Sequence, residues 1–281
     1  MQKYLFLVFG LFVFGQSLIS QTKVTCCSSS SVTQFAELAS DLTFVMAHDE
    51  PLPFVLSDPS GKNITFAVGP NAEDAKAYYI SGNKNSNQWI FVFQEWWGLN
   101  DYIRLQSEKL HDAFPNAHIL AIDLYDGKVA TTREDAGTYM QSAKPERLEQ
   151  IIQGAGKYAG PNTKVATIGW CFGGGWSNKA AVLLGDQVKA CIIYYGMPVL
   201  ESAQINQIKA PVLGIFADQD GWITPKVVGD FEAIMKKEGK LVDVHLYPAH
   251  HAFANPSNPK YDEKLSADAW SKSLAFIRKN L

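Results

Sequence analysis

Short apolar runs alternate with helical patterns over most of the chain beyond residue 60. The runs predict strands at 89–93, 118–122, 165–169, 190–194, 212–216 and 242–247. Apolar residues at helical spacing predict helices near 101–115, 134–158, 174–185, 224–238 and 262–280. Continuous apolar strands separated by helices indicate parallel strands that are buried on both faces. The pattern therefore predicts an α/β fold with a mostly parallel central sheet and helices on both faces.

Two further strands precede this alternation. Residues 64–68 and 75–80 have strand-like sequences joined by a Gly-Pro-Asn turn, which predicts an opening antiparallel hairpin. Residues 22–60 carry little periodic signal. We expect an N-terminal extension over residues 21–61 that packs on, or leads into, one catalytic-sized domain over residues 62–281.

The first 20 residues have the layout of a secretory signal peptide. Lys3 is followed by an apolar run from Tyr4 to Phe14 and then by small or polar residues. The run is shorter than the roughly 20 apolar residues that a bilayer-spanning helix needs. We therefore expect an exported protein, periplasmic or secreted, with no stable membrane span after cleavage. An uncleaved anchor or a buried N-terminal helix is the alternative.

The positions of the cysteines and histidines give no evidence for a lipid anchor or a metal site. Cys26 and Cys27 lie in a polar, Ser-rich stretch, and a lipid anchor at Cys26 is disfavoured because polar and charged residues precede it where a lipoprotein signal has small apolar ones. The cysteines and histidines lack the paired spacing of a metal site, so no metal is expected. No phosphate-cradling motif indicates an organic cofactor either.

Charge limits the class of partner. The formal net charge is −3 and the sequence pI is about 6.1. A basic field that would collect nucleic acid is therefore absent, and a small-molecule partner is favoured. The sequence carries no signal for the oligomeric state.

A Gly-x-Cys-x-Gly element lies between a predicted strand and a predicted helix, with Cys171 at its centre. Flanking glycines leave room for a sharp turn that exposes a nucleophile at the top of a strand. A thiol is intrinsically nucleophilic, and an adjacent base or a helix N-terminus favours its thiolate form. Alternatively, the turn only packs tightly and Cys171 is a small buried apolar residue.

An acid and a histidine follow at the ends of later strands. Asp218 and Asp220 come after the 212–216 run, and His250 and His251 come after the 242–247 run. The order nucleophile, acid, histidine is that of α/β-hydrolases. Either aspartate could instead be a turn former, and a lone histidine is often a surface residue. Three candidates in this order, each at a strand end, favour a catalytic triad.

The chain resembles the dienelactone hydrolase family over roughly residues 62–281. The resemblance rests on segments that occur in family order: Gln94 to Asn100, Asp123-Leu124-Tyr125, Gly169 to Gly174, Tyr194-Tyr195-Gly196, Gln219-Asp220 and His251 to Ala254. It implies an α/β-hydrolase fold, a catalytic domain over 62–281, and a hydrolase that cleaves a small carboxylic ester or lactone. It also aligns the family's acid with Asp220 and its histidine with His251.

The resemblance implies a role for each of these residues. Cys171 would attack the carbonyl, His251 would accept and return the proton, and Asp220 would orient the imidazole. Backbone N–H groups of Phe172 and Trp96 would form the oxyanion hole.

The family glutamate that matches Glu95 contacts the thiol and helps to activate it, so Glu95 is expected to be a second catalytic carboxylate. The alternative is that Glu95 is a strand-end surface charge or the partner of a helix cap.

Two positions depart from the family pattern. The family places an arginine shortly after Asp-Leu-Tyr and another after His-x-Phe-Ala, whereas this chain has Lys128 and Asn255 there. Lysine supplies a point charge but no bidentate fork, which puts dienelactone itself in doubt as the substrate. Candidate substrate contacts are therefore Lys128, Trp97, Tyr125 and Tyr195. Trp96, Trp97, Trp170 and Trp222 would make an aromatic pocket unless they pack the core.

Two alternatives belong to other functional classes. A non-catalytic protein could keep the fold to bind a small ligand, although the intact Cys-Asp-His set argues against it. Cys171 could also carry out thiol redox chemistry, since an exported reactive thiol is prone to oxidation. Cys191 falls within a predicted buried strand, so an obvious resolving cysteine is missing.

Overall fold

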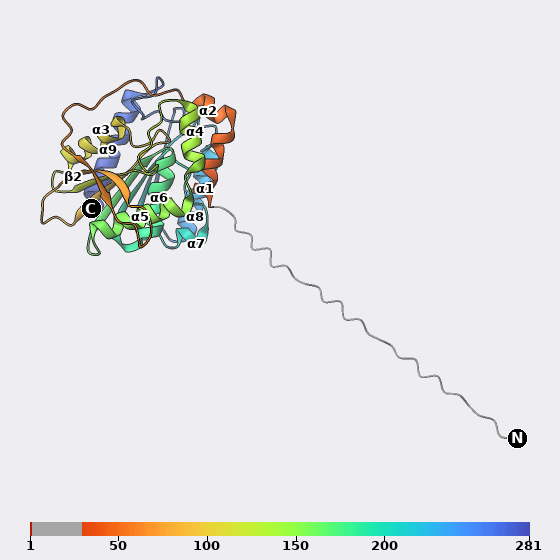
Figure 1. Ribbon diagram of the computed structural model, residues 1–281. Coiled ribbons are helices and arrows are strands. Elements are labelled where there is room, and N and C mark those ends of the chain that lie inside the picture. The colour runs from red at the N-terminus through yellow and green to blue at the C-terminus, as the bar shows by residue number, and fades with distance from the viewer. Residues whose placement is uncertain (2–29) are drawn as a thin grey trace.

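A single eight-stranded sheet forms the centre of the protein (Figure 1). The computed structural model describes residue 1 and residues 30–281. The spatial order of the strands is β1-β2-β4-β3-β5-β6-β7-β8. Their bounds are β1 Lys62–Phe66, β2 Ala75–Ile80, β3 Gln88–Phe93, β4 His118–Ile122, β5 Lys164–Trp170, β6 Val188–Tyr194, β7 Val212–Ala217 and β8 Val242–Tyr247.

Strand pairing follows from the connections between strands. β3 to β8 are mutually parallel where they pair, because a helix-containing connection returns the chain to the same end of the sheet. β1 and β2 pair antiparallel across a short turn, and β2 also pairs antiparallel with β4. The predicted opening hairpin is confirmed, and so is the mostly parallel sheet.

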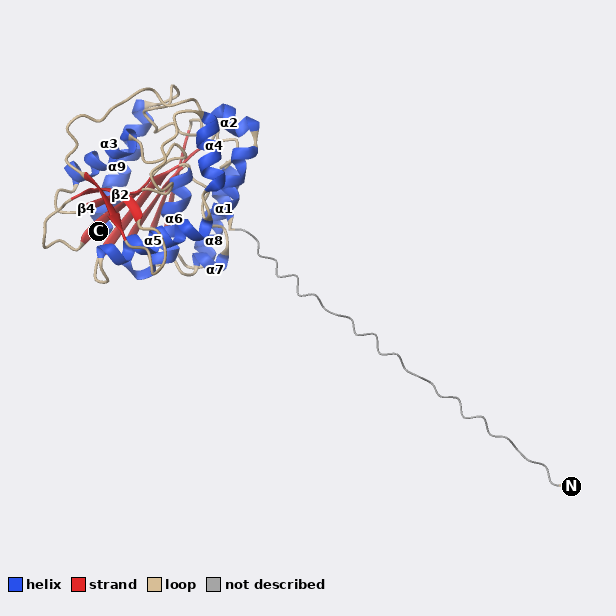
Figure 2. Ribbon diagram, viewed as in Figure 1, coloured by secondary structure: helices blue, strands red, loops and turns tan. Residues whose placement is uncertain are grey.

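Helices cover both faces of the sheet (Figure 2). α3 and α9 lie on one face, whereas α5 and α6 pack together on the other. The bounds of the helices that follow the opening hairpin are α3 Asp101–Ala113, α4 Arg133–Ser142, α5 Pro145–Ala159, α6 Phe172–Leu184, the 3₁₀ helix η2 Gly185–Gln187, α7 Ser202–Ile205, α8 Pro225–Lys237 and α9 Glu263–Asn280. The predicted α/β-hydrolase architecture is therefore confirmed.

One predicted helix is wrong in extent. The sequence predicts a continuous helix near 134–158, but the structure has α4 and α5 with a break at Ala143 and Lys144. Pro145 explains the break, because proline disfavours the helical conformation of the residue before it and fits the first turn of a new helix. Lys144 accordingly has extended dihedrals, with φ −71° and ψ 126°.

The extension before β1 packs on the domain. It forms α1 Ser31–Phe35, a 3₁₀ helix η1 Ala36–Ser40 and α2 Leu42–Ala47, which lie beside α4 at one side of the molecule (Figure 1). Ser30 and Asp41 cap α1 and α2 with their side chains. Val32, Phe35 and Phe44 are buried at the contact. This short apolar set fixes the segment, although it is too brief to give a clear helical period.

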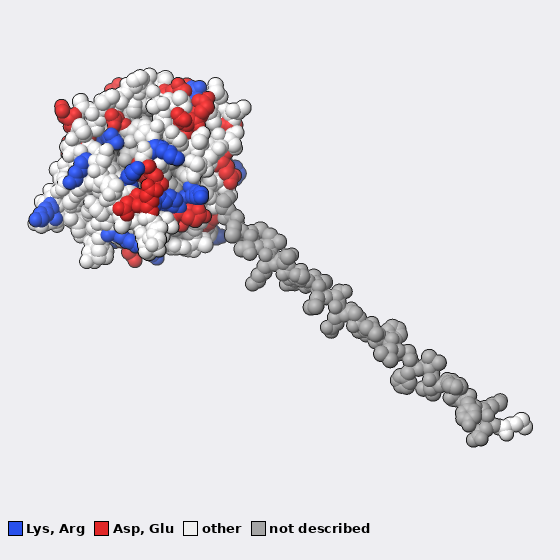
Figure 3. All heavy atoms as spheres, in the orientation of Figure 1, with Lys and Arg blue, Asp and Glu red and all other residues white. Residues whose placement is uncertain are grey.

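Membrane-spanning helices and surface charge can be described for residues 30–281. Within residues 30–281, no helix is long and apolar enough to cross a membrane. Acidic and basic side chains are interspersed on the face shown in Figure 3. The predicted signal peptide, and Cys26 and Cys27 with it, lie outside the described residues.

Candidate active site

The carboxyl edge of the sheet gathers the predicted site residues. Glu95 follows β3, Cys171 follows β5, Asp220 follows β7 and His251 follows β8. Carboxyl ends of parallel strands meet at one edge, where open α/β sheets bind ligands. The four side chains are buried there, each at 9% exposure or less.

A strained turn presents Cys171. Its backbone has φ 52° and ψ −120°, a conformation that L-residues rarely adopt, and it is the N-cap of α6. Glycine is required on either side because the chain passes close to β3. A Cβ on Gly173 would lie 2.3 Å from the carbonyl oxygen of Gln94, and one on Gly169 would lie 2.1 Å from that of Gly173. The turn thus places the thiol above the sheet at a helix N-terminus.

Asp220 orients His251. Its Oδ2 atom lies 2.6 Å from Nδ1 of His251, while its Oδ1 atom accepts the N–H groups of Trp222 and Ile223 at 2.9 and 3.0 Å. Burial alone would raise the pKa of Asp220, but His251 and these donors lower it. The neighbouring acid Asp218 and the neighbouring His250 are exposed. Geometry therefore selects Asp220 and His251 from the two pairs.

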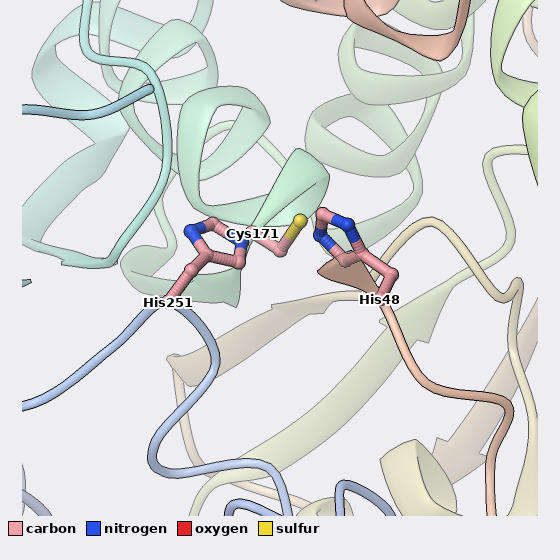
Figure 4. A group of neighbouring side chains, drawn as sticks. All are labelled: His48, Cys171 and His251. Carbon is pink, nitrogen blue, oxygen red and sulfur yellow. The ribbon is translucent and has the colours of Figure 1, made fainter. Parts of the chain in front are cut away.

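His251 presents its other nitrogen, Nε2, to Cys171 (Figure 4). Burial would lower the pKa of His251, but Asp220 and the ionised form of Cys171 raise it well above its usual value, so the imidazole is the proton acceptor when the thiolate forms. The Nε2 atom forms no well-aligned hydrogen bond within the described residues. Burial raises the pKa of the Cys171 thiol, an effect that His251 and the Phe172 N–H only partly oppose. In the closed site burial thus opposes ionisation of the thiol, and His251 favours it.

Glu95 is held close to the thiol by two neighbours. The hydroxyl of Tyr195 donates to Oε1 at 3.4 Å, and the Asn255 amide donates to Oε2. Burial raises the pKa of Glu95 to about 7, despite the lowering effects of His251, Tyr195 and Asn255. A carboxyl group poised near neutral pH is suited to proton exchange.

Comparison with known proteins agrees with this geometry. The sequence profile of the dienelactone hydrolase family matches residues 76–281. The chain belongs to the dienelactone hydrolase family. It is 30% identical over 216 residues to protein usf of Aquifex pyrophilus, an alignment that covers 72% of this chain and 93% of that protein. Identity to carboxymethylenebutenolidase 1 of Cupriavidus pinatubonensis is 26%, covering 72% of this chain and 90% of the relative.

Solved structures of the family share the fold. A dienelactone hydrolase-like promiscuous phosphotriesterase from metagenomic libraries superposes with a TM-score of 0.65 at 19% identity, covering 78% of this chain and 98% of that one. The dienelactone hydrolase from Anabaena variabilis gives 0.57 at 20% identity, covering 79% and 99%. With the family established, the chain is a carboxylic ester or lactone hydrolase.

The structure also places the other residues that were predicted to contact the substrate or to form the oxyanion hole. Tyr125 is buried beside Phe172, its hydroxyl has no partner among the described residues, and it lines a cavity of about 210 Å³ with Lys128. Trp96 packs edge-to-face on Trp97, with ring centroids 4.9 Å apart. The backbone N–H of Phe172 lies close enough to the sulfur to lower the pKa of the thiol.

Trp170 does not join the expected aromatic pocket. It packs against Tyr194 at 5.4 Å and lines a separate cavity with Trp270. Residues along a strand alternate between its two faces, so Trp170, which directly precedes the turn, points away from the thiol. Trp222, in contrast, packs edge-to-face on Phe44 of the extension, with ring centroids 5.2 Å apart.

Sequence reasoning missed His48. The residue follows α2 in the extension, and its ring lies 4.5 Å from that of Trp96 and 5.1 Å from that of His251. Burial, followed by the nearby His251, lowers the pKa of His48 to about 3, so the ring is neutral at physiological pH. In Figure 4 the thiol of Cys171 lies between the rings of His48 and His251. A single histidine in an aperiodic segment gives no signal of this placement.

Cys191 does not pair with Cys171. Both are free thiols, and Cys191 lies opposite Thr167 within the sheet. Cys171 donates its N–H to the carbonyl of Tyr194, three residues further along β6, at 3.0 Å. Three strand residues span roughly 10 Å, so Cys191 is not placed to be a resolving thiol.

Proposed function

We propose that this family member hydrolyses small carboxylic esters or lactones with Cys171 as the nucleophile and a thioester acyl-enzyme as the intermediate. The observation that carries the proposal is the buried Asp220–His251 pair, whose free Nε2 atom faces the thiol at the carboxyl edge of the sheet. Nucleophile, base and orienting acid are thereby placed in the order that acyl transfer requires.

Acylation begins with attack of the Cys171 sulfur on the carbonyl carbon. The thiol proton passes to Nε2 of His251, and Asp220 stabilises the resulting imidazolium. N–H groups of Phe172 and Trp96 stabilise the developing oxyanion. Collapse of the intermediate breaks the ester C–O bond, and His251 returns its proton to the leaving oxygen.

Deacylation repeats these steps with water. His251 removes a proton from a water molecule that attacks the thioester carbonyl, and the carboxylic acid and the free thiol are released. A lactone differs only in that its leaving oxygen stays attached to the acyl chain throughout, so that deacylation releases a single hydroxy acid.

Glu95 assists the ionisation of the thiol. Burial raises the pKa of the Cys171 thiol, and repulsion from a charged Glu95 raises it further. Because the pKa of Glu95 is about 7, the carboxyl group is able to take up a proton when the substrate enters. Protonation removes that repulsion and so favours the nucleophilic form of Cys171.

The cavity beside Tyr125 indicates a small substrate that contacts an aromatic ring. The cavity of about 210 Å³ beside Tyr125 has the size of a short acyl or alcohol group and is lined by Lys128 and Lys144 together with the Arg147–Asp126 ion pair. Asn255, the second departure from the family pattern, is bound to Glu95 and so does not replace the missing substrate-binding arginine. We therefore expect small esters that carry an acidic group to be accepted through lysine point charges rather than through a bidentate arginine contact.

A chromogenic short-chain aryl ester tests the mechanism. Cys171→Ala is expected to lower kcat by on the order of 1,000-fold or more, because covalent catalysis is lost. Cys191→Ala is the matched control, since it removes the other described thiol and leaves the site intact. Survival of most of the activity in Cys171→Ala would overturn the proposal.

The relay is tested by two aspartate variants and by mass spectrometry. Asp220→Asn disturbs the tautomer of His251 and is expected to lower kcat strongly, whereas Asp218→Asn, in the same turn but exposed, is expected to leave it unchanged. A slowly hydrolysed ester should leave its acyl mass on the peptide that contains Cys171. Acylation of any other residue contradicts the assignment.

A further inference from the structure

Three ligand atoms of kinds that bind thiophilic metals meet at the site. They are Nε2 of His48, Sγ of Cys171 and Nε2 of His251, and all lie within 4.8 Å of one another. Figure 4 shows the sulfur between the two rings, which come from segments far apart in the sequence. The triad accounts for two of these groups and leaves His48 without a function.

Both imidazoles are held in the tautomer that a metal needs. Nδ1 of His48 lies 2.7 Å from the carbonyl oxygen of Phe44, and a carbonyl only accepts, so Nδ1 carries the hydrogen and Nε2 keeps its lone pair. Asp220 fixes His251 in the same way. A backbone carbonyl and a carboxylate behind the ring nitrogens are the usual outer partners of metal-binding histidines.

Neither Nε2 atom has another partner. Both are buried, and neither forms a well-aligned hydrogen bond within the part of the chain that the structure describes, although the His251 nitrogen lies close enough to the Cys171 sulfur to influence its pKa. A buried nitrogen without a partner is costly and calls for an explanation. Packing of the His48 ring against Trp96 explains its burial but not why its bare nitrogen is directed at a reactive thiol.

We propose that His48, Cys171 and His251 form a binding site for a thiophilic divalent cation such as Zn²⁺. Two nitrogens and one thiolate sulfur match the ligand preference of zinc and cobalt, and contain no oxygen that would favour Mg²⁺ or Ca²⁺. Metal–nitrogen and metal–sulfur bonds of roughly 2.0 to 2.3 Å require the three atoms to approach one another by about 1 Å, within reach of side-chain rotation.

Binding displaces one proton and involves no change of oxidation state. The S–H bond of Cys171 breaks, its proton passes to solvent, and the sulfur electron pair forms the bond to the metal. A water molecule completes the fourth position. Because the coordinated sulfur is unavailable for attack, the cation acts as a reversible inhibitor of the esterase.

The site depends on the extension as well as on the family domain, because the extension supplies His48 and the domain supplies Cys171 and His251. The family profile matches residues 76–281, so His48 lies outside the region that it covers. The sequence predicted no metal site because the three ligands are separated by more than a hundred and by eighty residues and share no motif. Only the packing of α2 against Trp96 and Trp222 brings the third ligand into place.

Titration of the reduced full chain with Co²⁺ tests the proposal directly. Cys26 and Cys27 are replaced by serine in every protein used, so that any thiolate-to-cobalt charge-transfer band reports the buried thiols. We expect one equivalent of Co²⁺ to produce the band and Zn²⁺ to displace it. His48→Gln is expected to weaken binding by on the order of 100-fold, whereas the matched control His250→Gln keeps it.

Two more variants separate a lost ligand from a lost fold. Cys171→Ser should abolish the band, and His48→Cys, which restores a ligand at the same position, should recover binding. Absence of the band in the parent protein overturns the proposal, as does equal affinity in His48→Gln. The readout does not involve ester turnover. Metal binding without hydrolysis would therefore contradict only the proposed function, and hydrolysis without metal binding would contradict only this site.

Discussion

At the scale of single residues, burial controls the chemistry of the site. Glu95 is buried, and the ordinary glutamate pKa of 4.5 rises to about 7 mainly because its charged form loses solvation. The folded state therefore binds a proton between these two pH values that the unfolded state has lost. The unfolding free energy must therefore fall as pH rises through this interval, and the full loss is reached above about pH 7.

Glu95→Gln removes this titration. Wild type is expected to lose about 3 kcal/mol of unfolding free energy from this group between about pH 4.5 and 7, and the variant should not show that loss. Denaturant unfolding at several pH values measures the difference in slope. A constant difference in unfolding free energy at all pH values would contradict a raised pKa at Glu95.

At the scale of elements, the turn from β5 to α6 fixes where the nucleophile stands. The turn is possible only because β3 passes directly beneath glycines, close to the positions that side chains would occupy. Helix and strand are thereby packed more closely than larger residues permit. The position of the Cys171 side chain thus depends on the packing of β3 against β5 as well as on its own turn.

Gly173→Ala tests this packing. Its Cβ would lie 2.3 to 2.4 Å from two carbonyl oxygens of β3 and the residue after it, and a backbone cannot yield as a side chain can. We expect a loss of more than about 2 kcal/mol in unfolding free energy. Gly229→Ala in α8 is the control: nothing lies within 4 Å of its Cβ, so helix propensity should make it neutral or stabilising by up to about 1 kcal/mol. Similar values for both would refute the argument.

Elements were predictable wherever local sequence decides them. Apolar runs identified each parallel strand, and the strand ends located Cys171, Asp220 and His251 correctly at one edge. Pro145 was the one local signal that was overlooked, and it divides the helix predicted at 134–158. His48 could not be found in this way. Its position depends on Phe44, which packs against Trp96 and Trp222 far along the chain, and no local period encodes these contacts.

At the scale of the whole molecule, the extension closes the site. Ser31 donates to the carbonyl of Pro198 at 2.8 Å at one end of the segment. At the other end Arg133 donates to the carbonyl of His48 at 2.6 Å and pairs with Asp49 at 3.1 Å. Cys171 is left 1% exposed. Residues that cover the sulfur must therefore move before a substrate can reach it, and we predict that the segment around α2, which places His48 beside the sulfur, is among them.

The buried thiol is consequently a built-in reporter of that motion. If a small alkylating reagent reacts only with open molecules, the labelling rate of Cys171 equals the rate of a free thiol multiplied by the open fraction. Arg133→Ala loosens the anchor and, measured with a chelator present, should speed labelling several-fold to about tenfold, a change of about 1.4 kcal/mol at most. Arg278→Ala on α9 should have no effect. Should the two variants label equally fast, Arg133 does not hold the segment closed. If they differ as expected, the labelling rate of the parent protein divided by that of a free thiol gives the fraction of enzyme that is open to substrate at any moment.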